Sequence, residues 1–501
     1  MYRIFGPPGT GKTTTLLNMV DKSLSEGVPS SSIGFFAFTK KAAAEAKERA
    51  SRRFELDPDK DLPYFRTIHS LAYRLLSIKE HQMMGTAQYK ELSDAIGFEL
   101  NGTSYVDEWD TTVKTSDHPI LSLINLARTK KNHLRQEYNR SNINHTWLEV
   151  DYVASSYHNY KTANNLLDFT DLLQKFIEEA NFLLPHFDLC FLDEAQDLSP
   201  LQWDIAHKLD AKSKKMYCAG DDDQAIYVWG GADVDHFINL PGGSETLEQS
   251  HRVPRAVHEL AERVVSRIKN RFPKTYRPRD EMGSVQRIVD VNQLDMAHGS
   301  WLIMAHANYM LHPIATTLKE QGYLFLRGHD QRSIPEKMSV AINGWEQLRK
   351  GRAIHAGAIK AIYSFMSGNN IRIKRGFKKI DDDDDMLIDL KTLQTHYGLL
   401  IGADMIWHEA MDKIPDKDRA YIVAMLRRGE KFNAKPRIRL STIHGTKGGE
   451  AENVVLMPDL TNAALEQSGD ELHRTFYVGI TRTLKNLYIL EPDDYLKAYE
   501  L

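Results

Sequence analysis

Short apolar runs recur along the chain, and most are followed by a turn or by a stretch of helical character. Brief apolar strands that alternate with helices are typical of parallel α/β domains. Residues 40–53 follow one such run and are rich in Ala, Glu, Lys and Arg, which favour a helix. The apolar runs cover residues 2–5, 33–38, 189–194, 216–220, 301–305, 454–457 and 487–490.

Two long stretches do not follow this alternation of short strands and helices. Residues 80–165 and 331–435 are polar, mostly helical in pattern and poor in buried-strand signals. We interpret them as helical insertions into two α/β domains, and no fixed-period repeat accompanies them. The first domain then comprises residues 1–79 and 166–245, and the second comprises residues 246–330 and 436–501.

The composition is that of an ordinary globular protein, with 42% hydrophobic and 26% charged residues. The 64 basic and 68 acidic residues give a net charge of −4, which does not point to a polyanionic partner. A global sum, however, averages away a local basic groove. Cys190 and Cys218 lie in apolar runs, and we expect buried thiols. Because the sequence lacks a signal-peptide pattern and a long apolar run, we expect a cytoplasmic protein, or a nuclear one in a eukaryotic host.

Two charge clusters stand out. The five consecutive aspartates at residues 381–385 favour a solvated, acidic helix start, because negative charge is favourable at a helix N-terminus. Basic residues in the first insertion form either a duplex-binding face or a solvated helical face. They are Arg128, Lys130, Lys131, His133 and Arg135.

The most specific motif lies near the first residue. Residues 6–13 read GPPGTGKT, which fits the phosphate-binding pattern G-x-x-x-x-G-K-[ST] between an apolar run and a helical stretch. The glycines let backbone N–H groups approach phosphate oxygens, Lys12 reaches the β- and γ-phosphates, and Thr13 holds Mg²⁺. The predicted nucleotide-binding residues are Gly6, Pro7, Pro8, Gly9, Thr10, Gly11, Lys12, Thr13 and Thr14.

A second acidic element follows the apolar run at residues 189–192. Asp193 and Glu194 come at its carboxyl end, where open α/β sheets bind nucleotides. We predict that Asp193 holds Mg²⁺ together with Thr13, while Glu194 orients and deprotonates the attacking water. A solvated strand end is the simpler interpretation of an isolated Asp-Glu pair, and the phosphate-binding motif argues against it.

Residues 193–197 read DEAQD, which resembles a motif of the UvrD/Rep-like superfamily 1 helicases. Further segments resemble the other motifs in the order that this family has. The resemblance implies two RecA-like parallel-sheet motor domains, each with a mainly helical insertion. The matching segments are residues 36–49, 67–76, 168–173, 220–232, 247–254, 440–457 and 474–483.

The resemblance also implies roles for residues far along the chain. Gln224 would position the water and report the nucleotide state, and Glu450 would bind the ribose. Arg252 and Arg482 would come from the second motor domain and clamp the γ-phosphate, so that ATP closes a cleft between the domains. A surface ion pair is the alternative for each arginine.

Further matching positions are implied to contact DNA. Hydroxyl groups and backbone amides would hold phosphates, and Tyr227 and Trp229 would stack on bases, although ordinary core packing is the alternative for these aromatic rings. The implied contacts are Phe38, Thr39, Thr67, His69, Tyr227, Trp229, Thr442 and His444. Because stacking is indifferent to base identity, we expect binding without sequence specificity.

The chain is therefore expected to be an ATP-dependent DNA helicase that uses ATP and Mg²⁺ and moves 3′ to 5′ on single-stranded DNA. Replication or recombination proteins are the expected partners, and no membrane is. Two alternatives stay open: a DNA-stimulated ATPase that remodels protein–DNA complexes without unwinding, and a 5′-to-3′ or RNA-directed helicase. The family has an adenine-reading segment before the phosphate loop and an aromatic residue at the position of His251. Only five residues precede Gly6, so we expect a less strict preference for adenine.

Overall fold

The computed structural model describes residues 1–37, 40–101, 118–328, 330–377, 380, 383, 385–466 and 469–501, with only the backbone of residues 40–42. By their contacts these residues form two compact units. Unit 1 comprises Met1–Ser284, Ala463–Lys485 and Leu501, and unit 2 comprises Val285–Asn462 and Asn486–Glu500. The two units are defined by contacts between residues, whereas the predicted domains are defined by sequence motifs. The predicted domain boundaries therefore stay a prediction.

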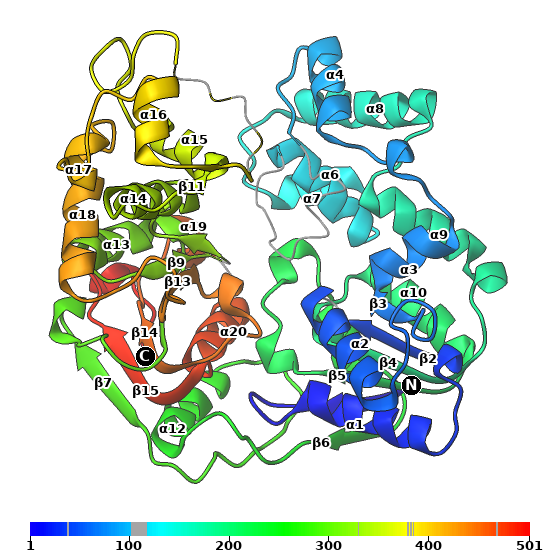
Figure 1. The fold of residues 1–501 in the computed structure, drawn as a ribbon. Coiled ribbons are helices and arrows are strands. Elements are labelled where there is room, and N and C mark those ends of the chain that lie inside the picture. Colours follow the sequence, from blue (N-terminus) through cyan, green and yellow to red (C-terminus); the bar gives the residue numbers. More distant parts are fainter. Residues whose placement is uncertain are drawn as a thin grey trace. The chain divides into compact units, whose positions relative to one another are not determined.

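A six-stranded sheet forms the centre of unit 1 (Figure 1). Its order is β3-β2-β4-β5-β1-β6, and every pairing is parallel. The four apolar runs that precede residue 221 all become strands here, which confirms the predicted parallel α/β architecture. The strands are β1 (Tyr2–Phe5), β2 (Ile33–Ala37), β3 (Phe65–Thr67), β4 (Phe187–Asp193), β5 (Ser213–Gly220) and β6 (Ser244–Thr246).

Helices cover both faces of this sheet. Successive strand residues point to opposite faces, so Phe35 and Phe36 of β2 enter different apolar clusters. Burial on both faces explains why the strands read as continuous apolar runs rather than as alternating ones. The helices of unit 1 outside the first insertion are α1 (Lys12–Ser25), α2 (Lys40–Phe54), α3 (Ile68–Leu75), α9 (Phe169–Leu183), α10 (Pro200–Ala211), α11 (Val234–Asn239), α12 (Arg255–Val265) and α20 (Gly469–Ile480).

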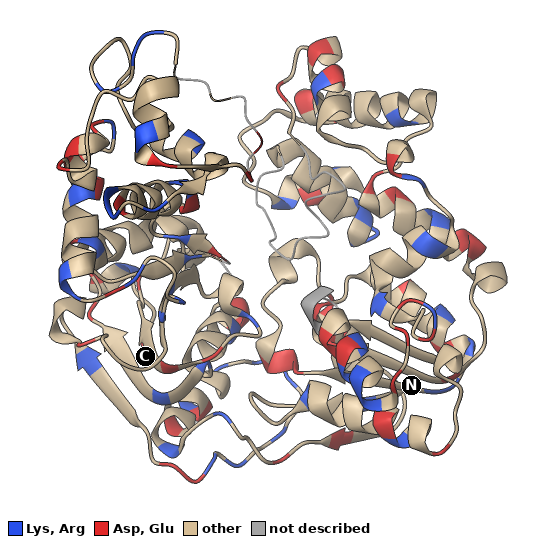
Figure 2. Cartoon of the chain, in the orientation of Figure 1, with Lys and Arg blue, Asp and Glu red and all other residues tan. Residues whose placement is uncertain are grey.

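The described part of the first insertion is helical, as predicted. It has an apolar cluster of its own, which includes Tyr89, Ile120 and Val153. Figure 2 shows basic and acidic residues interleaved along α4 as well as along α2, so neither helix carries charge of a single sign. The helices are α4 (Thr86–Ile96), α6 (Pro119–Thr129), α7 (Leu134–Arg140) and α8 (Trp147–Asn164).

Most residues of the basic cluster in the first insertion make contacts within unit 1, but Lys131, His133 and Arg135 are also exposed, so both sequence interpretations stay open. Arg128 forms ion pairs with Asp168, at 2.6 Å, and with Asp171. Lys130 pairs with Glu137, Lys131 pairs with Asp204, and the guanidinium of Arg135 lies over the ring of Trp147. These contacts link helices of unit 1 to one another.

Unit 2 is built on a seven-stranded sheet of order β10-β9-β13-β8-β14-β15-β7. The pairings β9–β13, β13–β8 and β8–β14 are parallel, and β10 pairs antiparallel with β9. The three apolar runs after residue 300 lie in β8, β14 and β15. The strands are β7 (Ser284–Ile288), β8 (Trp301–Ala305), β9 (Phe325–Arg327), β10 (Gln331–Arg332), β13 (Ile438–Thr442), β14 (Ala451–Leu456) and β15 (Thr483–Leu490).

The second insertion is mostly helical, as predicted, and packs around Trp345. It adds a small antiparallel pair, β11 (Ile354–His355) with β12 (Leu387–Ile388). The helices of unit 2 are α13 (His312–Glu320), α14 (Glu336–Arg349), α15 (Ala356–Ser364), α16 (Leu390–His396), α17 (Trp407–Ala410) and α18 (Asp416–Arg427). The short helix α19 (Asn462–Leu465) begins at the last residue of this segment of unit 2 and continues into unit 1. Among the described residues, no helix is long and apolar enough to cross a membrane.

The prediction that the aspartate run starts a helix is wrong. Asp381, Asp382 and Asp384 lie outside the described residues, while Asp383 and Asp385 are exposed. The next element is the strand β12, and the next helix, α16, is capped by the side chain of Asp389, which accepts from the backbone N–H of Thr392. A single capping carboxylate close to the helix start takes the role that the sequence assigned to the run.

Candidate active site

The phosphate loop, residues 6–13, connects β1 to α1 and ends on an open helix N-terminus. Gly11 occupies the N-cap position with a φ of 81°, and Gly9 has a φ of 71°. Both values lie in the left-handed region that favours glycine. Because Gly11 has no side chain to cap α1 and the first turn contains no acidic residue, the first backbone N–H groups of α1 suit an anion.

Lys12 folds back over its own loop. Its Nζ donates to the carbonyl oxygen of Gly6 at 2.7 Å, and a Cβ added to Gly6 would lie 1.9 Å from Cγ of Lys12. Position 6 therefore requires glycine to let the lysine side chain pass. A phosphate is a stronger hydrogen-bond partner for an ammonium group than a carbonyl is. A bound phosphate can therefore replace the Gly6 carbonyl as the partner of Lys12.

Thr13 and Asp193 form an oxygen-rich pair. The Thr13 hydroxyl donates to Oδ2 of Asp193 at 2.6 Å, and Asp193 is buried at the carboxyl end of β4. Burial, with repulsion from Glu194, raises the pKa of Asp193 to about 6. A hydroxyl and a carboxylate are the donors that Mg²⁺ takes from proteins beside a nucleotide, and the cation would relieve the cost of burying this carboxylate. The donor set therefore fits Mg²⁺.

Glu194 has an unusual backbone. Its φ of 56° and ψ of 41° place a non-glycine residue in the left-handed region, a conformation that costs about 1–3 kcal/mol and clusters at functional sites. The Nε2 of Gln196 donates to its Oε2 at 2.5 Å. The Oε1 of Gln196 accepts from the backbone N–H of Asp221 at 3.0 Å. Gln196 thus fixes the Glu194 carboxylate, a role that sequence reasoning missed although residue 196 lies within the DEAQD string.

The structure brings Gln224 and Arg482 together. Nη2 of Arg482 donates to Oε1 of Gln224 at 2.7 Å, and Nε of Arg482 donates to the carbonyl of Val478 in α20 at 3.0 Å. Nε2 of Gln224 donates to Oδ2 of Asp221 at 2.6 Å. Both members of the pair are buried. The amide of Gln224 is therefore oriented from both ends, and both predicted residues belong to unit 1.

Arg252 lies against the phosphate loop. The hydroxyl of Ser250 donates to the carbonyl of Pro8, and the backbone N–H of His251 donates to the carbonyl of Gly9, both at 2.8 Å. A Cβ added to Gly9 would lie 2.3 Å from Cβ of Arg252. This close approach explains the glycine at position 9. Sequence reasoning missed Ser250, which also accepts from the backbone N–H of Arg252.

The predicted DNA contacts of unit 1 have mixed local roles. Thr67 is the N-cap of α3, and its hydroxyl accepts from the backbone N–H of Ser70 at 3.2 Å. Burial lowers the pKa of His69 to about 4, so this residue is neutral at pH 7. The rings of Tyr227 and Trp229 meet edge to face at 6.2 Å, and Trp229 is 40% exposed, which rules out full core burial for Trp229. Phe38 and Thr39 lie outside the described residues.

Three predicted residues lie in unit 2. Thr442 ends β13, and its hydroxyl accepts from the backbone N–H of Gly445 at 3.1 Å. His444 begins the short 3-10 turn His444–Thr446 that follows β13. Glu450 is exposed and directly precedes β14. Their roles stay predictions.

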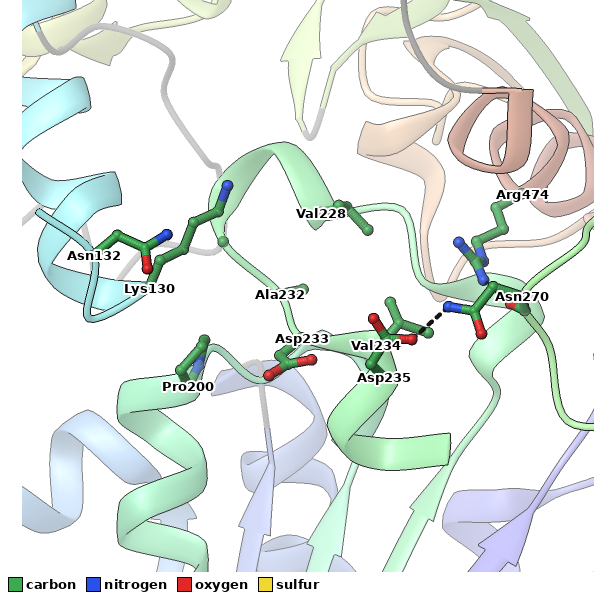
Figure 3. A pocket seen from close by; sticks show the side chains of 11 residues that line it. Lys130, Asn132, Pro200, Val228, Ala232, Asp233, Val234, Asp235, Asn270 and Arg474 are labelled. Atoms are coloured by element: carbon green, nitrogen blue, oxygen red, sulfur yellow. Dashed lines mark hydrogen bonds between the residues drawn. The ribbon is translucent and has the colours of Figure 1, made fainter. Parts of the chain in front are cut away.

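A pocket of about 280 Å³ opens beside the loop that carries Trp229 (Figure 3). Lys130 and Arg474 contribute positive charge to its wall, and Asp233 and Asp235 contribute negative charge. Asp235 accepts from the amide of Asn270 at 2.5 Å, as the dashed line shows. Charges of both signs line the pocket, so it does not present a single charge to a ligand.

Comparison with known proteins finds matches to two domain families. Residues 2–242 match the UvrD/REP helicase N-terminal domain family, and residues 420–491 match the UvrD-like helicase C-terminal domain family. The chain is 26% identical over 291 residues to the putative ATP-dependent DNA helicase YjcD of Bacillus subtilis, a match that covers 53% of this chain and 36% of that protein. The chain thus spans about a third of the length of that relative.

A second relative matches over nearly the whole chain. The ATP-dependent DNA helicase PcrA of Bacillus subtilis is 23% identical over 591 residues, which covers 96% of this chain and 79% of PcrA. The solved structure of a PRRSV helicase aligns over 100% of this chain and 54% of its own, with 11% identity and a TM-score of 0.35, too low to carry an argument. The two family matches and the PcrA match assign this chain to the UvrD/Rep-like superfamily 1 helicases, and it belongs to that family.

Proposed function

We propose that this chain is an ATP-dependent DNA helicase that moves 3′ to 5′ along single-stranded DNA. One observation carries the proposal: Thr13 of the phosphate loop contacts the buried Asp193, beside Glu194, at the carboxyl edge of the same sheet. This combination of loop, strand-end carboxylates and a nearby buried arginine is suited to phosphoryl transfer. Membership in the helicase family supports the coupling of that chemistry to DNA.

The phosphate loop binds the nucleotide. Lys12 exchanges its contact with the Gly6 carbonyl for the β- and γ-phosphates, and the open N-terminus of α1 receives their negative charge. Thr13 and Asp193 would hold Mg²⁺, which would neutralise charge on the phosphate oxygens. Glu450 binds the ribose and Thr14 completes the loop's contacts.

Glu194 acts as the general base. Its carboxylate, fixed by Gln196, takes a proton from the water that attacks the γ-phosphate. Gln224 orients this water, and Arg252 and Arg482 stabilise the charge that develops on the transferred phosphoryl group. Because Gln224 and Arg482 are already bonded to each other, a change at either residue is transmitted to the other.

DNA binding uses the phosphate backbone and the base faces. Thr67, with Phe38, Thr39, Thr442 and His444, holds the strand, and His69 contributes as a neutral hydrogen-bonding group because of its low pKa. The exposed ring of Trp229, with Tyr227 at its edge, stacks on bases without regard to their identity. Single-stranded and tailed duplex DNA are therefore the substrates, and replication or recombination proteins are the partners.

The test is ATP turnover with and without single-stranded DNA. We expect stimulation in the wild-type chain and loss of turnover in Lys12→Ala, which removes the phosphate contact. Lys22→Ala is the matched control, because Lys22 lies on the same helix, is 76% exposed and makes only a 3.9 Å ion pair with Glu26. Turnover that DNA does not stimulate, or that survives in Lys12→Ala, contradicts the proposal.

A further inference from the structure

A cluster of three buried carboxylates follows β5. The aspartate cluster comprises Asp221, Asp222 and Asp223, each at most 1% exposed. Three negative charges removed from water repel one another strongly unless cations neutralise them. Such clusters also bind metal ions, and this is the one group of three metal-ligand side chains found among the described residues.

A lysine occupies the position that a metal ion would take. Nζ of Lys274 lies 3.1 Å from Asp221, 2.6 Å from Asp222 and 2.6 Å from Asp223, and its side chain is 1% exposed. Burial lowers the pKa of Lys274, but the three carboxylates outweigh that effect and raise it. The ammonium group is therefore charged and serves as the counterion of the whole cluster.

Neighbouring groups complete the cluster. Arg271 forms two parallel bonds with Asp223, at 2.8 and 2.7 Å, and the backbone N–H of Phe272 donates to Asp222 at 2.7 Å. From α20, Nε of Arg474 donates to the carbonyl of Asp222 at 2.9 Å. Residues 271–274 and α20 therefore hold the loop after β5 from two sides.

One member of the cluster leads directly to the candidate catalytic pair. Asp221 uses Oδ1 for Lys274 and Oδ2 for the side-chain amide of Gln224, and Gln224 in turn accepts from Arg482. Every side chain in this sequence of contacts is at most 5% exposed, so water cannot replace any of them. Asp221 thus links the ammonium of Lys274 to the side-chain amide of Gln224.

We propose that Lys274 is a positioning residue for ATP hydrolysis, which acts through Asp221 to orient Gln224 and Arg482. The inference rests on the proposed function, because it takes Gln224 and Arg482 as members of the catalytic site. Lys274 contacts the carboxylates and not the nucleotide, so its removal changes the rate of the chemical step more than the affinity for ATP. A displacement of about 1 Å in a catalytic group costs up to about 100-fold in rate.

The test compares kcat and nucleotide affinity in Lys274→Met, with DNA present. We expect kcat to fall about 10- to 100-fold, while the Kd of a fluorescent ATP analogue changes by less than about twofold. Lys214→Met is the matched control, since Lys214 pairs with Asp188 at 2.5 Å on the surface and is 80% exposed. The control should keep both values. Unchanged kcat in Lys274→Met overturns the inference.

A structural role alone would also lower kcat, so coupling to Gln224 is measured. Gln224→Ala and Lys274→Met should each lower kcat, and the double variant should be no slower than Gln224→Ala. If the fold-decreases in kcat of the two single variants multiply in the double variant, Lys274 acts independently of Gln224. That result would overturn the inference. If Lys274→Met does not fold, Asp221→Asn replaces it, because Lys274 then keeps Asp222 and Asp223; the same non-additivity with Gln224→Ala is expected.

The controls also separate this inference from the proposed function. If the wild-type chain shows DNA-stimulated turnover that Gln224→Ala reduces, the ATPase part of the proposed function stands, and the behaviour of Lys274→Met decides the inference alone. If the wild-type chain shows no stimulated turnover, the proposed function fails, and the inference fails with it.

Discussion

Arg482 donates to Gln224 at 2.7 Å although the two residues are 258 positions apart in the sequence. Both side chains are buried. The residue proposed to orient water and the residue proposed to stabilise the phosphoryl group therefore hold each other in place. Preorganised groups avoid the cost of reorientation during the reaction, which is the main way that enzymes stabilise developing charge.

Glu194→Gln should stop hydrolysis and spare binding. The amide cannot accept a proton, whereas Lys12 and Thr13 still contact the phosphates, and removal of a general base costs about 10²–10⁴-fold in rate. Steady-state ATPase assays and titration with a fluorescent nucleotide measure the two effects separately. Turnover at the wild-type rate would show that Glu194 is not the base.

Gly9→Ala should impair turnover through a steric clash. The new Cβ would lie 2.3 Å from Cβ of Arg252, so this arginine is displaced from the phosphate loop. Gly27→Ala is the control, because Gly27 has a φ of 85°, similar to the 71° of Gly9, but nothing lies within 4 Å of the added Cβ. Both variants should lose about 1–2 kcal/mol of stability from backbone strain. Only Gly9→Ala should lose ATPase activity, and equal activities would contradict the role of this contact.

Asp168→Ala should destabilise the first insertion. Asp168 is 5% exposed and accepts from Arg128 and Lys161 at 2.6 and 2.5 Å, and the ammonium of Lys161 is itself buried. Removal of one partner of a buried ion pair costs about 3–5 kcal/mol, because it leaves the other charge without its counterion. The surface carboxylate of Asp188, which pairs with the exposed Lys214, provides the control, and Asp188→Ala should cost about 0–1 kcal/mol. Denaturant unfolding measures both losses, and equal losses would contradict the account.

The carboxylate of Asp168 should also make the stability of the folded protein sensitive to acid. Burial raises the pKa of Asp168, but Arg128 and Lys161 outweigh it and hold the pKa well below its usual range. A depressed folded-state pKa gives stability that is complete above the unfolded value of about 3.9 and is lost as the pH falls towards the folded value. Below about pH 4, wild-type stability should therefore fall more steeply than that of Asp168→Asn. Parallel pH profiles of the two proteins would count against this assignment.

The parts of the site that lie in one local segment could be predicted from the sequence. The phosphate loop requires glycines at fixed spacing before a helix, and Asp193 follows an apolar run, so both signals are contiguous in the chain. The strands of the buried sheet could likewise be predicted, because burial on both faces leaves uninterrupted apolar runs such as residues 33–37.

Contacts between distant segments could not be predicted in the same way. Ser250 meets the carbonyl of Pro8 and Lys274 meets the aspartate cluster only after the chain has folded, and neither residue differs locally from a surface serine or lysine. At the aspartate run, residues 381–385, a local sequence signal is present but predicts the wrong element. Its composition suits a helix N-terminus, but the element that follows it is the strand β12, and the next helix is capped by Asp389.

The most direct measurement of the central claim is strand displacement from duplexes that carry a single-stranded tail on one end. With ATP and Mg²⁺, the chain should displace the strand from a 3′-tailed duplex and not from a 5′-tailed one, and Glu194→Gln should displace neither. Displacement from the 5′ tail alone would contradict the proposed direction. DNA-stimulated ATP turnover without displacement from either tail would instead indicate a translocase that remodels protein–DNA complexes, and would contradict the helicase activity itself.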